Sequence, residues 1–311
     1  MNEPGPLSPP EPPAPPPPPG RAWRRAAGPP VLALLLAASG AALFLRRDFD
    51  RPAGPARGSP LIVQVQAGTG VRAISQALAE RGLIRHPLAF QLQARLRGGA
   101  RRIRAGYYEF SPSMPPRAIY RALTEGRVAQ RTFTIPEGYN LREITLAIER
   151  SGLAPRGAIL DAARDPELLS RAGAEGGSLE GYLFPDTYRF PLGTPPREIL
   201  SAMAQNLRRK FSPALRERAE KLGLSLHEAL TLASLIEKET PMGAERPLVS
   251  AVFWNRLKKD MPLQSDPTVS FALPGLEGPL RRQDLSADSP YNTYLHKGLP
   301  PGPLASPGRP A

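Results

Sequence analysis

One local pattern occurs twice in the chain without a gap, and this repeat constrains the fold more than any other feature. Residues 67–83 read AGTGVRAISQALAERGL, and residues 137–153 read EGYNLREITLAIERSGL. Each copy has a glycine turn, apolar residues at helical spacing and a closing glycine, as an amphipathic helix does. The alternating residues before the first copy are typical of a strand. The pattern therefore predicts two βα units, which are either a common packing unit or a duplicated glycan-binding element.

The elements around the repeat predict an α+β fold with two globular parts. Between the copies, AGYYEF and PPRAIYRALTEGRV add a strand and a helix, so residues 61–131 are expected to form a small α+β module. Residues 132–311 are predicted to be mainly helical. We expect SLEGYLFPDTYRFPLG and the chain from Met261 onward to be irregular loops that build a groove. Helices are expected at Pro155–Ala172, Pro196–Leu222, Leu226–Thr240 and Ala244–Lys259.

The amino-terminal part predicts a tail and a membrane-spanning helix. Residues 1–27 are rich in proline, which favours an extended, polyproline-like tail. Residues 28–45 carry no charge, and a helix of that length spans about 27 Å, enough to cross the core of a bilayer. A transmembrane helix is therefore expected there, followed by a linker at 46–60. A cleaved signal peptide is the alternative, because Ala38–Ala41 offers small residues near a cleavage point.

The charge of the chain favours an anionic partner. The 311 residues carry a formal net charge of +13, with a dense arginine cluster at 95–104. Nucleic acid, lipid head groups and acidic cell-wall polymers fit this charge, as does a solvated arginine-rich surface. No nucleic-acid-reading motif is visible, so we expect no nucleic-acid partner. The chain has no cysteine, and its three histidines lack metal-ligand spacing, so we expect neither a metal nor another cofactor.

Glu237 is the leading candidate for acid–base chemistry. In the predicted helix SLHEALTLASLIEKETP, Leu226, Leu230, Ala233 and Glu237 lie within about 60° of one another, so Glu237 continues the apolar face. Glu239 lies at the margin of the polar side. A carboxyl group in apolar surroundings disfavours its charged form, which keeps a proton available for general-acid catalysis. The alternative is a buried glutamate that is satisfied by a backbone or arginine partner.

Three further segments predict a sugar-binding groove. They are LEGYLFPDTY around Glu180 and Asp186, LQSDPTV around Asp266, and SPYNTYLHKGLPPGPLASPG. Aromatic side chains cover the apolar faces of sugar rings, whereas amides and hydroxyls bind the ring hydroxyl groups. Each segment alone is equally typical of a rigid loop.

Five segments in a fixed order resemble the endolytic murein transglycosylases, the YceG-like family: LEGYLFPDTY, LASLIEKET, VFWNRL, LQSDPTV and SPYNTYLHKGLPPGPLASPG. The resemblance covers about 61–308. It implies a single-pass protein of the bacterial cytoplasmic membrane with a cytoplasmic amino terminus, a LysM-like region at 61–131 and a periplasmic catalytic domain at 132–311. The implied partners are the glycan strands of peptidoglycan, the membrane and peptidoglycan synthases.

The resemblance also implies the reaction and its residues. The first glutamate of the Glu-Lys-Glu motif corresponds to Glu237, which would protonate the oxygen of the β-1,4 bond between N-acetylmuramic acid and N-acetylglucosamine. The muramyl 6-hydroxyl would then close a 1,6-anhydro ring, which would end the elongation of nascent strands. Glycan contacts would come from residues that match the other motifs: Glu180, Tyr182, Gln264, Asp266, Tyr291, Asn292, Thr293 and Tyr294.

Two other functions are compatible with the same residues. A hydrolase would use Glu237 with Asp266 or Glu180 as a second carboxylate and would leave reducing ends. A non-catalytic scaffold would bind glycan through residues 61–131. The chain departs from the family pattern after Gly308, where family members continue with a further strand-forming segment, so we expect a shortened catalytic domain.

Overall fold

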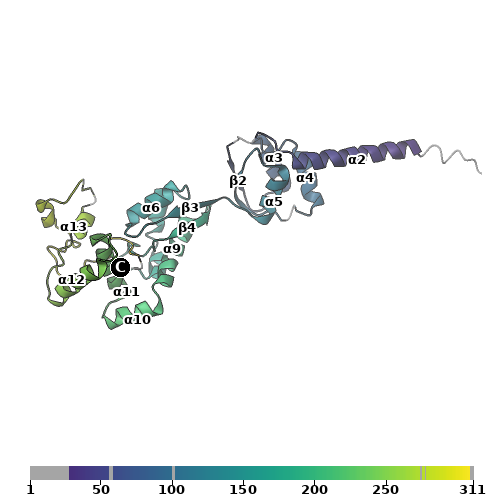
Figure 1. The fold of residues 1–311 in the computed structure, drawn as a ribbon. Helices are drawn as coiled ribbons and strands as arrows, with labels where there is room; N and C mark the ends of the chain where they lie inside the picture. Colours follow the sequence, from purple (N-terminus) through teal and green to yellow (C-terminus); the bar gives the residue numbers. More distant parts are fainter. Residues whose placement is uncertain (1–27, 56–58, 100–101, 274, 277, 309–311) are drawn as a thin grey trace, which may run out of the picture. The chain divides into compact units, whose positions relative to one another are not determined.

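The computed structural model describes residues 28–55, 59–99, 102–273, 275–276 and 278–308 (Figure 1). The contacts within the chain divide it into two compact units. The first unit contains the described residues up to Pro60 together with those of Thr69–Arg102 and Phe110–Arg121. The second contains Leu61–Gly68, Ile103–Glu109 and the chain from Ala122 onward. The predicted tail at 1–27 lies outside the described residues.

The first unit is a group of helices around three aromatic rings. Its helices are α2 (Gly28–Asp50), α3 (Val71–Glu80), α4 (Pro87–Leu96) and most of α5 (Pro116–Glu125). The ring of Phe49, near the end of α2, lies 6.0 Å from the rings of both Phe90 and Tyr120 and is 2% exposed. The guanidinium of Arg97 lies 5.0 Å from the centre of the Phe49 ring. The last turns of α2 are therefore part of the folded unit.

The predicted transmembrane helix at 28–45 is wrong. Among the residues that the structure describes, no helix is long and apolar enough to cross a membrane. The helix α2 includes this segment, but it continues through two arginines to Asp50. Asp48 binds His86 Nδ1 at 2.7 Å, and the neighbouring Phe49 is buried. The carboxyl-terminal turns of α2 are thus charged and packed against protein, which leaves a short apolar run.

The described part of the second unit contains two short pairs of strands. β1 (Leu61–Val65) pairs with β2 (Gly106–Phe110), and β3 (Gln130–Thr134) pairs antiparallel with β4 (Thr187–Pro191). In the second pair Phe133 lies opposite Tyr188, and their stacked rings are 5.7 Å apart. Cross-strand aromatic pairs of this kind stabilise a sheet. Residues 178–193 were predicted to be an irregular loop, which is wrong for Thr187–Pro191 and agrees with the structure for 178–186.

Prolines divide the long helices that the sequence predicts. The residue before a proline disfavours helical geometry, and Asp165 before Pro166 and Ser212 before Pro213 are extended and cap the helices that follow. Two helical segments also lie in the stretch after Met261 that was predicted to be irregular. The helices of this unit are α6 (Leu141–Arg150), α7 (Arg156–Ala162), α8 (Pro166–Ala172), α9 (Pro196–Lys210), α10 (Pro213–Lys221), α11 (Leu226–Glu239), α12 (Arg246–Lys258), α13 (Asp266–Ala272) and a 3-10 helix (Arg282–Ser286).

The helix α11 is shared by two hydrophobic cores of the second unit. Leu230 packs in the larger core, which also contains Tyr182. Leu235 and Ile236 pack in the smaller core with Leu304 from the carboxyl-terminal segment. Because the two cores cover different faces of α11, most of its second half is buried. A polar side chain in this half is therefore placed inside the protein.

The repeat predicted from the sequence is present in the backbone. β1 and α3 form the first copy, and β3 and α6 form the second. The turn glycines Gly68 and Gly138 have φ of +80° and +77°, and the closing glycines Gly82 and Gly152 have +67° and +77°. Glycine adopts positive φ without the steric cost that a side chain brings, which explains why both positions repeat.

A separate LysM-like module at 61–131 is not supported. By their contacts, β1 and most of β2 belong to the second unit, whereas α3 and α4 belong to the first. The described fold mixes helices with a few short strands, and its helical second unit contains every predicted site residue.

Candidate active site

Glu237 lies in the last turn of α11 and is buried. A capping box fixes the start of this helix, because Ser225 and Glu228 each accept the backbone N–H of the other. The side chain of Glu237 is 5% exposed, whereas Lys238 and Glu239 are exposed. The unequal burial of the two glutamates agrees with their predicted places on the helix.

Both carboxylate oxygens of Glu237 have a hydrogen-bond donor. Nη2 of Arg246, the first residue of α12, lies 2.5 Å from Oε1, and the N–H of Gly308 donates to Oε2 at 3.2 Å. The same Nη2 atom is 3.7 Å from Oε2 of Glu137. The guanidinium thus lies between two carboxylates. A buried glutamate with a backbone and an arginine partner was the alternative to a catalytic acid, and the geometry contains both partners.

Burial raises the pKa of Glu237, and the nearby charge of Glu137 adds to the rise. The Gly308 N–H, the Arg246 guanidinium and Lys238 act in the opposite direction without cancelling the effect of burial. A carboxyl group with a raised pKa keeps its proton to higher pH, and a neighbouring cation stabilises the carboxylate that is left when the proton is donated. The arrangement can therefore donate a proton and take one back.

A short backbone ladder holds Glu137 and Gly308 beside Glu237. The N–H of Gly138 donates to the carbonyl of Ser306 at 2.9 Å, and the N–H of Ser306 donates to the carbonyl of Tyr139 at 2.8 Å. The ladder joins the glycine turn of the second repeat copy to the carboxyl-terminal segment. The repeat therefore helps to build the site.

Sequence reasoning missed Glu137, Arg246 and Gly308 as neighbours of Glu237. They come from three segments of the chain, and no helical spacing relates any of them to Glu237. The one available signal was in the repeat, where Glu137 stands opposite Ala67 in the gapless alignment. An acidic residue gained in one copy of a repeat indicates a role beyond packing.

Three of the predicted glycan-binding residues lie near the end of α11. Gln264 and Asp266 are exposed, and Gln264 has a φ of +49°, which is uncommon for a residue with a side chain. The hydroxyl of Tyr294 donates to Asp266 at 2.6 Å, and this hydrogen bond raises the pKa of Tyr294 to about 12. The hydroxyl of the intervening Ser265 donates to Glu239 at 2.9 Å, which ties this group to α11. The three polar side chains are available to a ligand.

Asn292 and Thr293 face the interior of the protein. Nδ2 of Asn292 donates to the carbonyls of Leu285 and Ala287 at 3.0 and 2.8 Å. The hydroxyl of Thr293 lies 2.9 Å from that of Thr268, and both residues are buried. These side chains hold the loops that carry Gln264 and Tyr294. Their predicted contact with glycan stays a prediction.

Glu180 caps a helix instead of standing free. The N–H of Leu141, the first residue of α6, donates to both of its carboxylate oxygens, at 2.9 and 3.0 Å. Burial raises the pKa of Glu180 to about 8, against the effect of the N–H groups of Leu141 and Gly181. Its predicted role in glycan binding is untested, whereas its role in fixing the start of α6 is evident.

Tyr182 is fully buried and belongs to a small polar cluster. Its hydroxyl lies 2.8 Å from Nδ1 of His227, whose Nε2 lies 2.8 Å from the carbonyl of Pro301. A carbonyl only accepts, so Nε2 carries the ring proton and, in the neutral ring, Nδ1 accepts from Tyr182. Tyr182 thus supports the carboxyl-terminal segment from inside.

Tyr291 is half-buried, with its ring 4.9 Å from that of Phe271.

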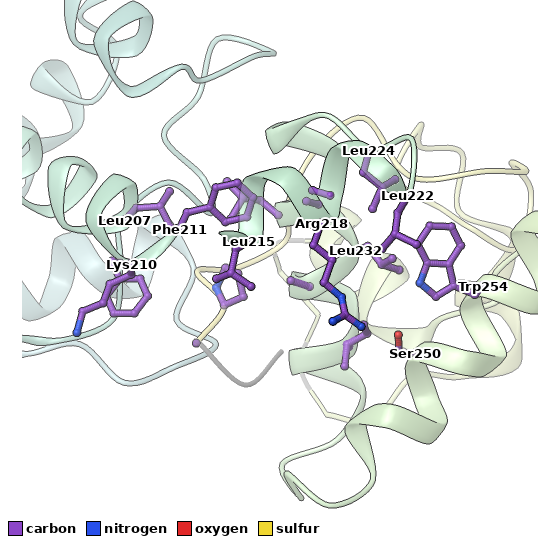
Figure 2. A pocket seen from close by; sticks show the side chains of 18 residues that line it. Leu207, Lys210, Phe211, Leu215, Arg218, Leu222, Leu224, Leu232, Ser250 and Trp254 are labelled. Carbon is purple, nitrogen blue, oxygen red and sulfur yellow. The ribbon is translucent and has the colours of Figure 1, made fainter. Parts of the chain in front are cut away.

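An apolar pocket of about 420 Å³ lies beside α11 (Figure 2). Figure 2 shows Leu215 and Arg218 between Phe211 on one side and Trp254 on the other. Ile236 and Gly308 also line it, so it borders the site without containing Glu237. None of the described residues predicted to bind glycan lines this pocket. Its leucine-rich wall does not match the polar surroundings that a sugar needs.

Comparison of the chain with known proteins identifies its family. A family model described as the YceG-like family matches residues 63–311. The chain belongs to the YceG-like family. This confirms the resemblance inferred from the five sequence segments.

Two relatives of this YceG-like chain have the same name. The chain is 34% identical over 262 residues to the endolytic murein transglycosylase of Bacillus subtilis (strain 168). This match covers 79% of the chain and 72% of the Bacillus protein. The chain is 32% identical over 281 residues to the endolytic murein transglycosylase of Streptococcus pneumoniae (strain D39), covering 79% of this chain. The chain spans about half the length of that pneumococcal relative (50%).

A solved structure is similar to this YceG-like chain as well. The 2.6 Å crystal structure of a YceG-like protein of Listeria monocytogenes matches with a TM-score of 0.55 and 34% sequence identity. The match covers 81% of this chain and 88% of that one. The fold described above is therefore that of the family.

Proposed function

We propose that the chain is an endolytic murein transglycosylase, a lyase that cuts carbon–oxygen bonds within glycan strands of peptidoglycan. Two supports come from different sources. Its relatives carry this name over 79% of the chain. Independently, the second unit holds a buried carboxyl group, Glu237, with a raised pKa and a cation beside it. Glu237 with Arg246 is the single observation that carries the proposal.

The proposed reaction needs one carboxyl group. Glu237 donates its proton to the oxygen of the β-1,4 bond between N-acetylmuramic acid and N-acetylglucosamine, and the carbon–oxygen bond breaks. The muramyl 6-hydroxyl attacks the anomeric carbon, and Glu237 takes the hydroxyl proton. The products are a strand with a 1,6-anhydro end and a strand with a free 4-hydroxyl. No water enters, so no second carboxylate is needed to activate it.

The exposed side chains near the end of α11 are the proposed contacts with the strand. Gln264 and Asp266 present an amide and a carboxylate to solvent, and Tyr294 adds an aromatic ring. Amides and carboxylates bind sugar hydroxyls, and an aromatic ring covers the apolar face of a sugar.

Because peptidoglycan lies outside the cytoplasm, we propose that the second unit acts on the outer side of the bacterial cytoplasmic membrane. A reporter that is active only outside the cytoplasm, fused after the second unit, tests this location.

The products of cleavage in water labelled with oxygen-18 test the proposed reaction. The full chain is incubated with isolated glycan strands, and the fragment ends are measured by mass spectrometry. The proposal expects anhydromuramyl ends within long strands and no label in them. Labelled reducing ends would assign a hydrolase, and unchanged strands that bind the folded chain would assign a scaffold.

A further inference from the structure

Arg246 lies between two carboxylates that come from different parts of the second unit. Its Nη2 atom is 2.5 Å from Oε1 of Glu237 and 3.7 Å from Oε2 of Glu137. The side chains of Arg246 and Glu237 are 8% and 5% exposed, whereas that of Glu137 is 44% exposed. One cation therefore serves one buried and one open carboxylate.

The guanidinium of Arg246 also has an unused donor. Its Nε atom is buried and finds no acceptor among the described residues. A buried charge is costly unless its donors are paired, so an arginine that only stabilises a fold is expected to use them all. The unused donor indicates that the guanidinium is not fixed by Glu237 alone.

The observed pairing opposes the first step of the proposed reaction. A cation this close to a carboxylate stabilises the charged form. General-acid catalysis starts instead from the protonated carboxyl group, and the contact becomes favourable only after the proton has left. A second anion within reach resolves this conflict, because the guanidinium can then leave Glu237 without losing its counter-charge.

We propose that Arg246 is a positioning residue that alternates between Glu137 and Glu237 during the reaction. This inference rests on the proposed function and deepens it. While Glu237 carries the proton, Arg246 pairs with Glu137. When Glu237 gives its proton to the glycosidic oxygen, Arg246 pairs with the new carboxylate. When Glu237 takes the proton of the muramyl 6-hydroxyl, Arg246 returns to Glu137, so the site ends with the protons and charges with which it began.

The groups that face Glu237 make this inference testable by titration. They are Arg246 from α12, Glu137 from the turn between β3 and α6, Lys238 from α11 itself and the N–H of Gly308. Glu137→Gln removes the second anion and leaves Arg246 on Glu237, which favours the carboxylate. Arg246→Gln removes the cation and favours the protonated group. The two changes therefore move the titration of Glu237 in opposite directions.

The experiment is the pH dependence of strand cleavage by the full chain and by Glu137→Gln, Arg246→Gln and Arg246→Lys. On the alkaline limb of kcat/KM, Glu237 loses the proton that it must donate. We expect this limb to move about one pH unit lower in Glu137→Gln and about one unit higher in Arg246→Gln. The kcat of Arg246→Gln should fall about 10- to 100-fold, and Arg246→Lys should recover part of the loss.

An Arg246 that stays on Glu237 would also give opposite shifts, because its charge and that of Glu137 act on Glu237 from fixed positions, and the two shifts would then add in the double variant Glu137→Gln/Arg246→Gln. With alternation Glu137 acts through Arg246, so the double variant should titrate like Arg246→Gln, and additive shifts would overturn the inference. Limbs that stay in place or move in the same direction would overturn the inference while leaving the proposed function intact. If Arg246→Gln does not fold, Arg246→Met, which keeps an apolar stem in the buried position, takes its place in the single and double variants. An unmodified chain that makes no anhydromuramyl ends at any pH would overturn the proposed function and this inference together.

Discussion

Glu180 accepts the N–H of Leu141 with both carboxylate oxygens, at 2.9 and 3.0 Å, and so fastens the loop before β4 to the start of α6. The same loop continues into Tyr182, which supports the carboxyl-terminal segment through His227. The loop thus links the turn that carries Glu137 to the segment that carries Gly308. We expect changes in this loop to reach the site through the backbone.

The stability of the protein should fall with rising pH because of Glu180. Burial raises its pKa from an ordinary value of 4.5 to about 8, so the folded state binds more protons than the unfolded state between these values. The contribution is full below pH 4.5 and is lost as the pH rises through about 8. In Glu180→Gln the decrease in the free energy of unfolding between pH 4.5 and about 8 should be smaller than in the unmodified chain by about 2–4 kcal/mol. Denaturant titrations at several pH values measure it, and equal slopes for both proteins would contradict the prediction.

Gly181→Ala should destabilise the second unit more than Gly152→Ala does. Both glycines have positive φ, +80° and +77°, so alanine strains both backbones. At Gly181 an added Cβ would also lie 2.3 Å from a side-chain carbon of Pro303, whereas at Gly152 it would meet nothing within 4 Å. We expect a loss of about 1 kcal/mol at Gly152 and about 2–4 kcal/mol at Gly181. Thermal unfolding compares the pair, and equal losses would show that residue 303 does not pack on the loop.

Asn292→Ala and Tyr294→Phe should separate a residue that stabilises the fold from one at the proposed glycan contacts. Asn292 is buried, and its amide makes two donated hydrogen bonds and accepts one from the N–H of Tyr294 at 3.0 Å. Its loss should cost about 2–4 kcal/mol of stability. Tyr294→Phe keeps the ring but removes the hydroxyl that binds Asp266, so it should change stability by less than about 1 kcal/mol while raising KM for glycan strands through Asp266. An unchanged KM would show that the hydrogen bond from Tyr294 does not position Asp266 for the glycan strand.

Local features of the site could be predicted from the sequence. The helix α11 begins at a capping box, Ser225 with Glu228, and its periodicity places Glu237 on the buried side. The glycines of the repeat have positive φ in both copies, a conformation that follows from the local geometry of the two turns. Such features depend on residues that are neighbours in the chain.

Contacts between distant segments could not be predicted in the same way. The strand β4 exists because Tyr188 stacks on Phe133 of β3, although its own segment is rich in prolines. The end of α2 is held by Phe49 against rings of two other helices, which the uncharged run before it did not indicate. Arg246 reaches Glu237 only because α12 starts beside the end of α11. Each of these depends on tertiary packing, which overrides local pattern.

The measurement that tests the central claim most directly compares Glu237→Gln with Glu220→Gln. Glu220 is exposed on α10, so it undergoes the same chemical change away from the site. Folding of both variants is first checked by circular dichroism, and the appearance of anhydromuramyl ends from isolated strands is then followed by mass spectrometry. We expect Glu237→Gln to lose at least about 100-fold in rate and Glu220→Gln to match the unmodified chain. Anhydromuramyl ends made at the full rate by a folded Glu237→Gln variant would contradict the account.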